Sequence, residues 1–111
     1  MPTSLIVSIV RKGWGDTVLT ASKKAGAHGG TVMLGRGVGI HENQSILGIA
    51  IEPEKEIVLT LVYTDAADAI LDAIVTAAKL DEPGNGLAFV VPVSRLEGVP
   101  HVLGHGGDKS A

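Results

Sequence analysis

The chain has 111 residues, a formal net charge of −3 and no cysteine, and 45% of its residues are hydrophobic. This length allows a single domain. The acidic balance excludes sequence-independent binding to nucleic acid, which needs clustered cations, and the absence of cysteine excludes disulfides and thiolate metal sites. The N-terminus lacks the basic stretch of a signal peptide, and the first apolar run is too short to cross a bilayer. We therefore expect a cytoplasmic protein without direct membrane insertion.

The first part of the chain predicts a strand, a helix and a second strand. Residues 5–10 are β-branched and almost continuously apolar, which indicates a central strand buried on both faces. Asp16 suits the N-cap of a helix that ends near Ala25, because its carboxylate can accept bonds from the free N–H groups of the first turn. A second strand is expected from residue 30, and it passes into the glycine-rich residues 35–39.

A loop and a third strand follow. Residues 40–47 are polar in the middle and predict a mobile loop. Residues 48–52 predict the return of the chain as a strand, which continues over residues 56–63. Pro53 cannot donate to a sheet ladder, so we expect a bend between these two parts.

The last part predicts a second helix and a fourth strand. Asp65 suits the cap of this helix, and its buried stripe would consist of Ile70, Leu71, Ile74, Val75 and Ala78. Residues 81–86 have the composition of a turn, and residues 87–93 predict a strand that is almost wholly apolar. The glycine-rich tail over residues 101–111 is expected to be flexible.

The element order is strand-helix-strand-strand-helix-strand, in two similar halves. It predicts an α+β, ferredoxin-like βαββαβ fold, with a four-stranded antiparallel sheet and two helices on one face. The domain would span residues 1–100. Its apolar residues are mainly Val, Ile, Leu and Ala, and they exceed what a monomer of this size easily hides. An oligomer that buries one face of the sheet between subunits accounts for this excess.

Two glycine clusters lie at strand ends, at residues 35–39 and 84–86. Backbone N–H groups in such turns can form a concave anion site, and the missing side chains let a phosphate come close. Arg36 could add a charge-assisted hydrogen bond to that phosphate. Taken alone, either cluster is explained by a simple turn. As a pair in this element order, the clusters favour a ligand site.

Five segments, in order, are similar to those of one signalling family. The first is Ala25-Gly26-Ala27-His28-Gly29-Gly30-Thr31, at the end of the first helix and the start of the second strand. The next two are Gly35-Arg36-Gly37, at the base of the family's regulatory loop, and Pro53-Glu54-Lys55-Glu56-Ile57, where that loop rejoins the sheet. The last two are Asp72-Ala73-Ile74-Val75, in the second helix, and Gly84-Asn85-Gly86-Leu87-Ala88-Phe89-Val90, which resembles the family's second signature, a Gly-acidic-Gly turn followed by a basic residue and a strand. The chain thus resembles the P-II signalling proteins over about residues 4–99.

The resemblance implies a homotrimer that binds adenine nucleotides in the clefts between subunits and regulates a target protein through a projecting loop. The target would be a membrane transporter or an enzyme of nitrogen or carbon metabolism. The ligand-binding residues would be Thr31, Gly35, Arg36, Gly37, Leu61, Val62, Gly84, Asn85 and Gly86. In the short regulatory loop at residues 38–48, the partner contacts would be His41, Glu42, Asn43 and Gln44.

The chain departs from the P-II pattern where cations would meet a triphosphate. Leu87 stands in place of a lysine, and Gly98 and Pro100 stand in place of arginines. Losing three charge-assisted contacts weakens ATP binding, so a less charged effector is expected: AMP, ADP, a cyclic nucleotide or a non-nucleotide anion. The loop contains no tyrosine, which excludes the uridylylation seen in classical members.

Two other classes of function are compatible with parts of the sequence. A divalent-metal-handling trimer of the cation-tolerance type is the first, because the chain has four histidines and His101 and His105 have a metal-like spacing. The glycines and prolines around this pair argue against a helix there, so no metal site is expected. An enzyme of the small ferredoxin-like type is the second. No Ser-His-Asp arrangement, metal triad or P-loop can be made from these residues, so no catalytic residue is assigned and no enzyme is expected.

Overall fold

The computed structural model describes residues 2–39, 45–46, 49–50 and 53–98. Strand β1 (Thr3–Arg11) lies inside the main sheet, and its burial alternates strictly along the chain. Ser4, Ile6, Ser8 and Val10 are buried, whereas the residues between them are only half-buried. Successive side chains of a strand point to opposite faces, so a single chain fully buries one face of β1. The expectation of burial on both faces is not met within one chain.

The main sheet has the strand order β2-β5-β1-β6, with β2 at Thr31–Arg36, β5 at Glu54–Tyr63 and β6 at Gly86–Val93. Every neighbouring pair is antiparallel. This arrangement confirms the ferredoxin-like βαββαβ fold, in which the central strands β1 and β5 come from different halves of the chain.

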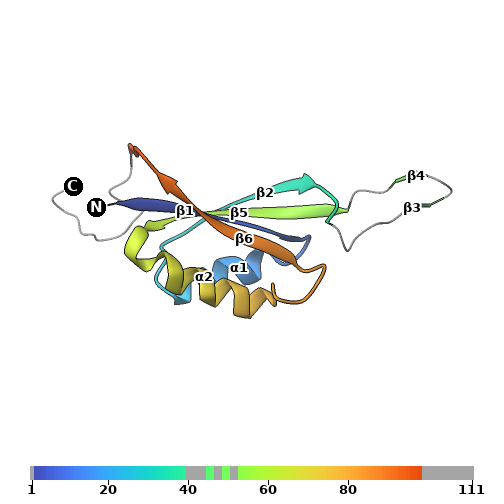
Figure 1. Ribbon diagram of the computed structural model, residues 1–111, viewed down its shortest axis with the longest axis horizontal. Coiled ribbons are helices and arrows are strands. Elements are labelled where there is room, and N and C mark those ends of the chain that lie inside the picture. The colour runs from blue at the N-terminus through green and yellow to red at the C-terminus, as the bar shows by residue number, and fades with distance from the viewer. Residues whose placement is uncertain (1, 40–44, 47–48, 51–52, 99–111) are drawn as a thin grey trace.

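A separate two-stranded hairpin consists of β3 (Ser45–Ile46) and β4 (Ile49–Ala50). The sequence predicted loop for the first of these segments and a strand continuous with the sheet for the second. The structure corrects both expectations, because the two segments pair with each other and β5 begins only after Pro53. Figure 1 shows this hairpin beyond the end of the four-stranded sheet, and β5 begins at Glu54, directly after Pro53.

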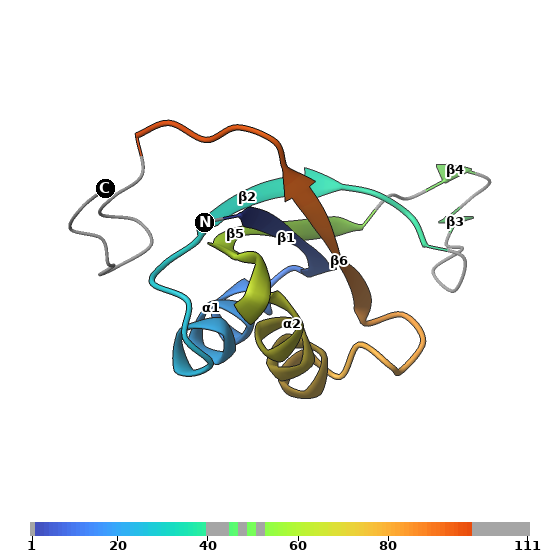
Figure 2. The same ribbon diagram turned by 60° about the vertical axis from the view of Figure 1, so that its left-hand side comes forward.

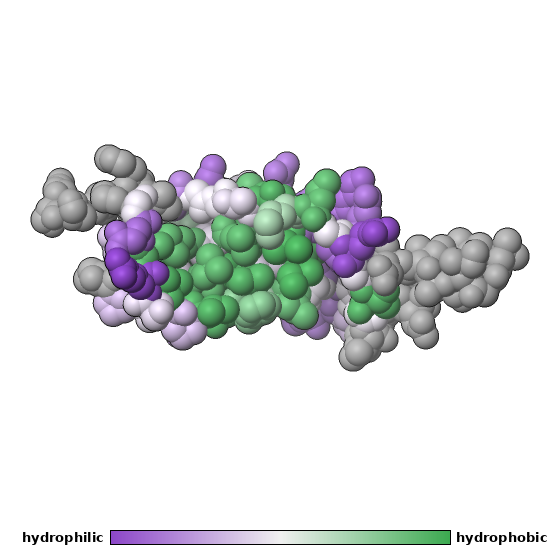
Figure 3. Space-filling view, turned by 90° about the horizontal axis from the view of Figure 1, so that it is seen from above, coloured by the Kyte–Doolittle hydropathy of each residue, from purple (hydrophilic) through white to green (hydrophobic). Residues whose placement is uncertain are grey.

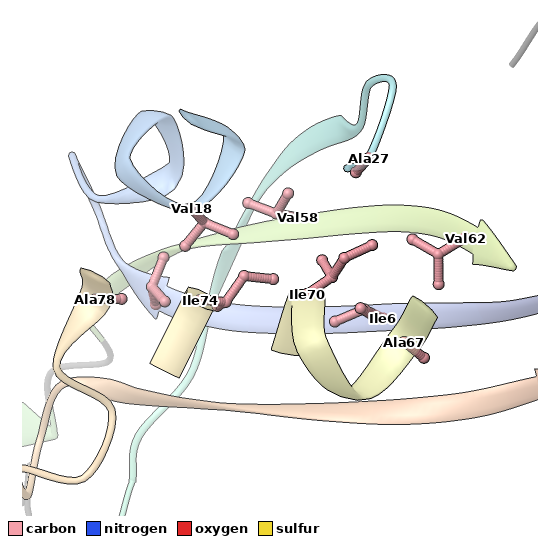
Figure 4. Packing of buried hydrophobic residues seen from close by; sticks show 10 residues of the cluster. Ile6, Val18, Ala27, Val58, Val62, Ala67, Ile70, Ile74 and Ala78 are labelled. Atoms are coloured by element: carbon pink, nitrogen blue, oxygen red, sulfur yellow. The ribbon is translucent and has the colours of Figure 1, made fainter. Parts of the chain in front are cut away.

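Helices α1 (Gly15–Lys24) and α2 (Thr64–Ala78) cover the same face of the sheet and lie side by side (Figures 1 and 2). The core between helices and sheet is small and aliphatic (Figure 4), and its buried members are Ile6, Val10, Val18, Ala27, Val58, Val62, Ala67, Ile70, Ile74 and Ala78. No helix in the described ranges is long and apolar enough to cross a membrane.

Neither predicted aspartate caps its helix. The N-cap residues are Trp14 and Tyr63, and neither makes a side-chain capping bond. Asp16 and Asp65 instead lie in the first turns, where a negative charge still favours the helix dipole. The start of α1 is held by a residue distant in the sequence, because the Gly15 N–H donates to Oε1 of Glu56, 2.6 Å away.

The other face of the sheet carries no helix and is strongly apolar (Figure 3). The register places Leu5, Val7 and Ile9 of β1 opposite Val91, Phe89 and Leu87 of β6. Phe89 and Leu87 keep 43% and 52% of their surface exposed. We call this surface the open face. It is the excess of apolar surface that the composition predicted. Monomeric proteins rarely expose such a patch, so we expect a partner surface to bury it.

Candidate functional site

The two glycine clusters line one cavity of about 430 Å³. It lies where β2 ends and β6 begins, with β1 and β5 between them. We call it the glycine pocket; its lining consists of Ile9, Gly35, Arg36, Gly37, Val38, Gly39, Lys55, Ile57, Gly84, Gly86 and Leu87. The clusters are 45 or more residues apart in sequence, and the antiparallel register brings them to the same end of the sheet.

The turn at residues 84–86 needs glycine at both ends. Gly84 and Gly86 have φ angles of +86° and +127°, a backbone region that side chains disfavour. A Cβ on Gly86 would collide with the carbonyl oxygen of Ile9, so the turn packs directly on β1. Arg11 Nε donates to the Gly84 carbonyl at 3.0 Å and fixes the other end of the turn. The two glycines therefore form a backbone wall of the pocket.

The opposite wall follows β2. Gly35 pairs with Lys55 in the sheet, and a Cβ on Gly35 would lie 3.1 Å from Cδ1 of Ile57. A Cβ on Gly37 would meet nothing within 4 Å, so its backbone stays accessible. The Gly37 N–H donates to the Pro53 carbonyl at 3.2 Å, which joins the two ends of the segment between them. The pocket thus adjoins the base of the predicted regulatory loop.

Two cations and an apolar surface complete the pocket. Arg36 was predicted, whereas Lys55 was assigned no role although it is only 7% exposed and lines the cavity. Side chains two residues apart in a strand share a face, so Lys55 lies on the same face as Ile57. This alternation could have identified Lys55 from the sequence. Ile9, Ile57 and Leu87 supply apolar lining from the open face. The site therefore combines positive charge with a surface that suits a flat apolar group.

An ion pair lies at the start of β5. Lys12 Nζ and Glu54 Oε1 are 2.8 Å apart, and both side chains remain more than half exposed. Their hydrogen bond lowers the pKa of the Glu54 carboxyl and raises the pKa of Lys12. Because the pair is solvated, its contribution to folding is small. It connects the turn after β1 with the first residue of β5.

Three predicted ligand residues lie elsewhere in the chain. Thr31 begins β2, and Leu61 and Val62 lie near the end of β5, so all three are toward the opposite end of the sheet. Leu61 and Val62 line a separate cavity of about 210 Å³. Within one chain these residues do not join the glycine pocket. Their role in a shared site stays a prediction for the trimer.

Asn85 lies between two lining glycines but does not line the pocket itself. Its side chain points to the end of α2, where Nδ2 donates to the Lys79 carbonyl at 2.9 Å. The predicted partner contacts His41, Glu42, Asn43 and Gln44 lie outside the described residues, as do His101 and His105. Within the described ranges, no group of three or more His, Cys, Asp or Glu residues could hold a metal ion.

Comparison with known proteins agrees with this geometry. The family described as "Nitrogen regulatory protein P-II" matches residues 3–100. Among solved structures, Arabidopsis thaliana PII bound to citrate is similar, with 27% sequence identity, a TM-score of 0.70, and coverage of 91% of this chain and 86% of that one. No curated protein matches the sequence. P-II proteins are regulators, and trimer formation and nucleotide binding are general properties of the family. This chain belongs to the P-II family.

Proposed function

We propose that this P-II regulator binds a small anionic effector, an adenine nucleotide such as AMP or ADP, in clefts between the subunits of a homotrimer. The bound effector would change the affinity of the loop at residues 38–48 for a target protein, such as a membrane transporter or an enzyme of nitrogen or carbon metabolism. The observation that carries this proposal is the glycine pocket, which joins both glycine clusters and two cations at the base of that loop.

An anion fits the pocket for three reasons. The glycines leave the backbone open to close approach, the positive φ angles of Gly84 and Gly86 suit concave N–H arrangements, and Lys55 and Arg36 supply positive charge. A charge-assisted hydrogen bond is about twice as strong as a neutral one. Citrate, bound in the Arabidopsis protein, is itself a small anion.

The number of cations favours few phosphates. A phosphate monoester carries a charge of about −1.5 to −2 at neutral pH, which Lys55 and Arg36 can balance. Leu87, which stands where the P-II signature has a lysine, presents an apolar side chain to the same pocket. Further phosphate groups would lose their hydration without a cation in return. We therefore expect AMP and ADP to bind more tightly than ATP.

The open face supports a site between subunits. A closed trimer is a cyclic assembly, in which the contact joins one surface of a subunit to a different surface of the next. Such a contact can bring the Thr31 and Leu61 end of one chain toward the glycine pocket of its neighbour. The nine predicted ligand residues would then meet, although one chain holds them at opposite ends of its sheet.

The pocket can communicate with the loop through the backbone. Arg36 and Gly37 both line the pocket, and Gly37 also binds the Pro53 carbonyl on the returning strand. An effector that binds two loop arrangements unequally shifts the balance between them. Calorimetric titration of the purified protein with AMP, ADP, ATP and cyclic AMP tests the proposal. Saturable binding of AMP or ADP is expected, and no heat from any of the four would remove the nucleotide claim.

A further inference from the structure

The Gly84–Gly86 turn is anchored to the end of α2 by one side chain. Lys79 ends this helix in the left-handed conformation, with φ 55° and ψ 48°. Its carbonyl accepts from the Glu82 N–H at 3.1 Å and from Asn85 Nδ2 at 2.9 Å. Asn85 Nδ2 also lies 3.5 Å from Oε1 of Glu82. Both neighbours of the amide are acceptors, so the group that faces them must be the NH₂.

This anchoring separates the roles of three consecutive residues. Gly84 and Gly86 line the glycine pocket, whereas the side chain of Asn85 turns to the helix end. We infer that Asn85 is a positioning residue: its amide donor, and not merely its size, holds the two glycines at the pocket. The inference rests on the proposed function for the role of the pocket, but the anchoring itself can be tested without a ligand.

An acidic residue cannot supply the hydrogen-bond donor of Asn85. An ionised carboxylate only accepts hydrogen bonds, so Asp at this position would place oxygen atoms against the Lys79 carbonyl and the Glu82 carboxylate. The turn is therefore held at the end of α2 by an amide donor, which a carboxylate does not provide.

Arg11 supports the same turn from the other side. Its Nε donates to the Gly84 carbonyl, while Gly86 packs on the β1 backbone at Ile9. The turn is therefore attached to a helix end, to a side chain and to a strand, and the Asn85 N–H also donates to the Glu82 carbonyl at 3.3 Å. Loss of the Asn85 side-chain donor leaves the other attachments in place, so the fold should persist while the turn opens locally.

The experiment compares wild type with Asn85→Asp, which nearly preserves shape but removes the donor. In ¹⁵N-labelled protein without ligand, one side-chain amide proton of Asn85 should exchange slowly. In the variant, the backbone amides of residues 84–86 should exchange about tenfold faster, which corresponds to one lost hydrogen bond. By calorimetry, the Kd for AMP should rise by about the same factor, with little change in Tm because the core is untouched.

Ser94→Asp is the matched control, because it adds the same charge at an exposed position beyond the far end of β6. It should change neither readout. Equal exchange and equal AMP affinity in wild type and Asn85→Asp would overturn the inference, as would the same changes in the control. If Asn85→Asp does not fold, Asn85→Ala removes the donor without adding charge and should give the same acceleration. If wild type binds neither AMP nor ADP, the proposed function fails, and the exchange comparison still decides the role of Asn85.

Discussion

Lys55 belongs to strand β5 and also lines the glycine pocket. It lies one residue into β5, opposite Gly35 of β2, and only 7% of its surface is exposed. A lysine at such a position keeps its aliphatic stem against apolar neighbours and directs its ammonium toward a polar region. In this chain Lys55 lines the pocket between the two glycine walls.

Replacing Lys55 by Met should weaken effector binding while retaining the aliphatic stem. Hydrogen bonds to charged groups are worth roughly 1.5–3 kcal/mol, so the Kd for AMP should rise about ten- to a hundredfold. Isothermal calorimetry measures this change. Lys23→Met, at an exposed position in the last turn of α1, is the control and should leave the Kd unchanged. An unaltered affinity in Lys55→Met would remove Lys55 from the site.

Gly86 should be intolerant of any side chain. Its φ of +127° disfavours other residues, and an added Cβ would collide with the Ile9 carbonyl. We expect Gly86→Ala to lower the free energy of unfolding by about 2 kcal/mol or more, as measured by urea denaturation. Gly29→Ala is the matched control, because a Cβ there meets nothing within 4 Å. Similar stability losses in both variants would contradict this account.

At the scale of elements, the start of α1 depends on β5. Glu56 accepts the Gly15 N–H at 2.6 Å, and a Cβ on Gly15 would collide with that carboxylate. The carboxylate of Glu56 therefore acts as an N-cap for α1, although it belongs to strand β5. It also places a negative charge at the positive end of the helix dipole. This contact ties the helix layer to the strand that also carries Lys55.

Glu56→Ala should therefore destabilise the protein by about 1 kcal/mol, the usual cost of losing a helix cap. Chemical denaturation followed by circular dichroism provides the measurement. Glu54→Ala is the control two residues earlier on the same strand. Its solvated pair with Lys12 should contribute nothing measurable to stability. Equal effects of the two substitutions would show that the cap is not specific.

For the whole molecule, the open face is the dominant feature. Apolar residues of all four main strands share this face, and Figure 3 shows them as one continuous surface. Monomeric proteins rarely expose such a patch. Trimer formation is a general property of the P-II family, and we expect a contact between subunits to bury this face.

A charge on the open face should break the trimer. Phe89 is 43% exposed and lies opposite Val7, so Phe89→Lys would bury a cation in the subunit contact at a high cost. Light scattering after size-exclusion chromatography should show a trimer for wild type and a smaller species for the variant. Thr20→Lys, on the exposed side of α1, should stay trimeric. A trimeric Phe89→Lys would place the contact elsewhere.

The sequence alone determined the order of the elements and the ferredoxin-like fold. The spacing at which side chains return to the same face differs between helices and strands. The strand at residues 5–10 and the helical stripe from Ile70 to Ala78 can therefore be recognised without tertiary contacts. The two glycine clusters could also be recognised in the sequence, and positive φ angles explain the residue type at Gly84 and Gly86. The aliphatic excess predicted an interface, because a single domain of this size does not easily bury that much apolar surface.

Only the tertiary structure decided which of these features meet. The antiparallel register brings residues 35–39 and 84–86 into one pocket and holds Thr31 and Leu61 at the other end. The tertiary structure also places Lys55 in the lining of that pocket, makes Glu56 instead of Asp16 the acceptor at the start of α1, and orients the Asn85 side chain toward the end of α2. These contacts join residues from different elements, and a local pattern does not encode the partner that the fold supplies.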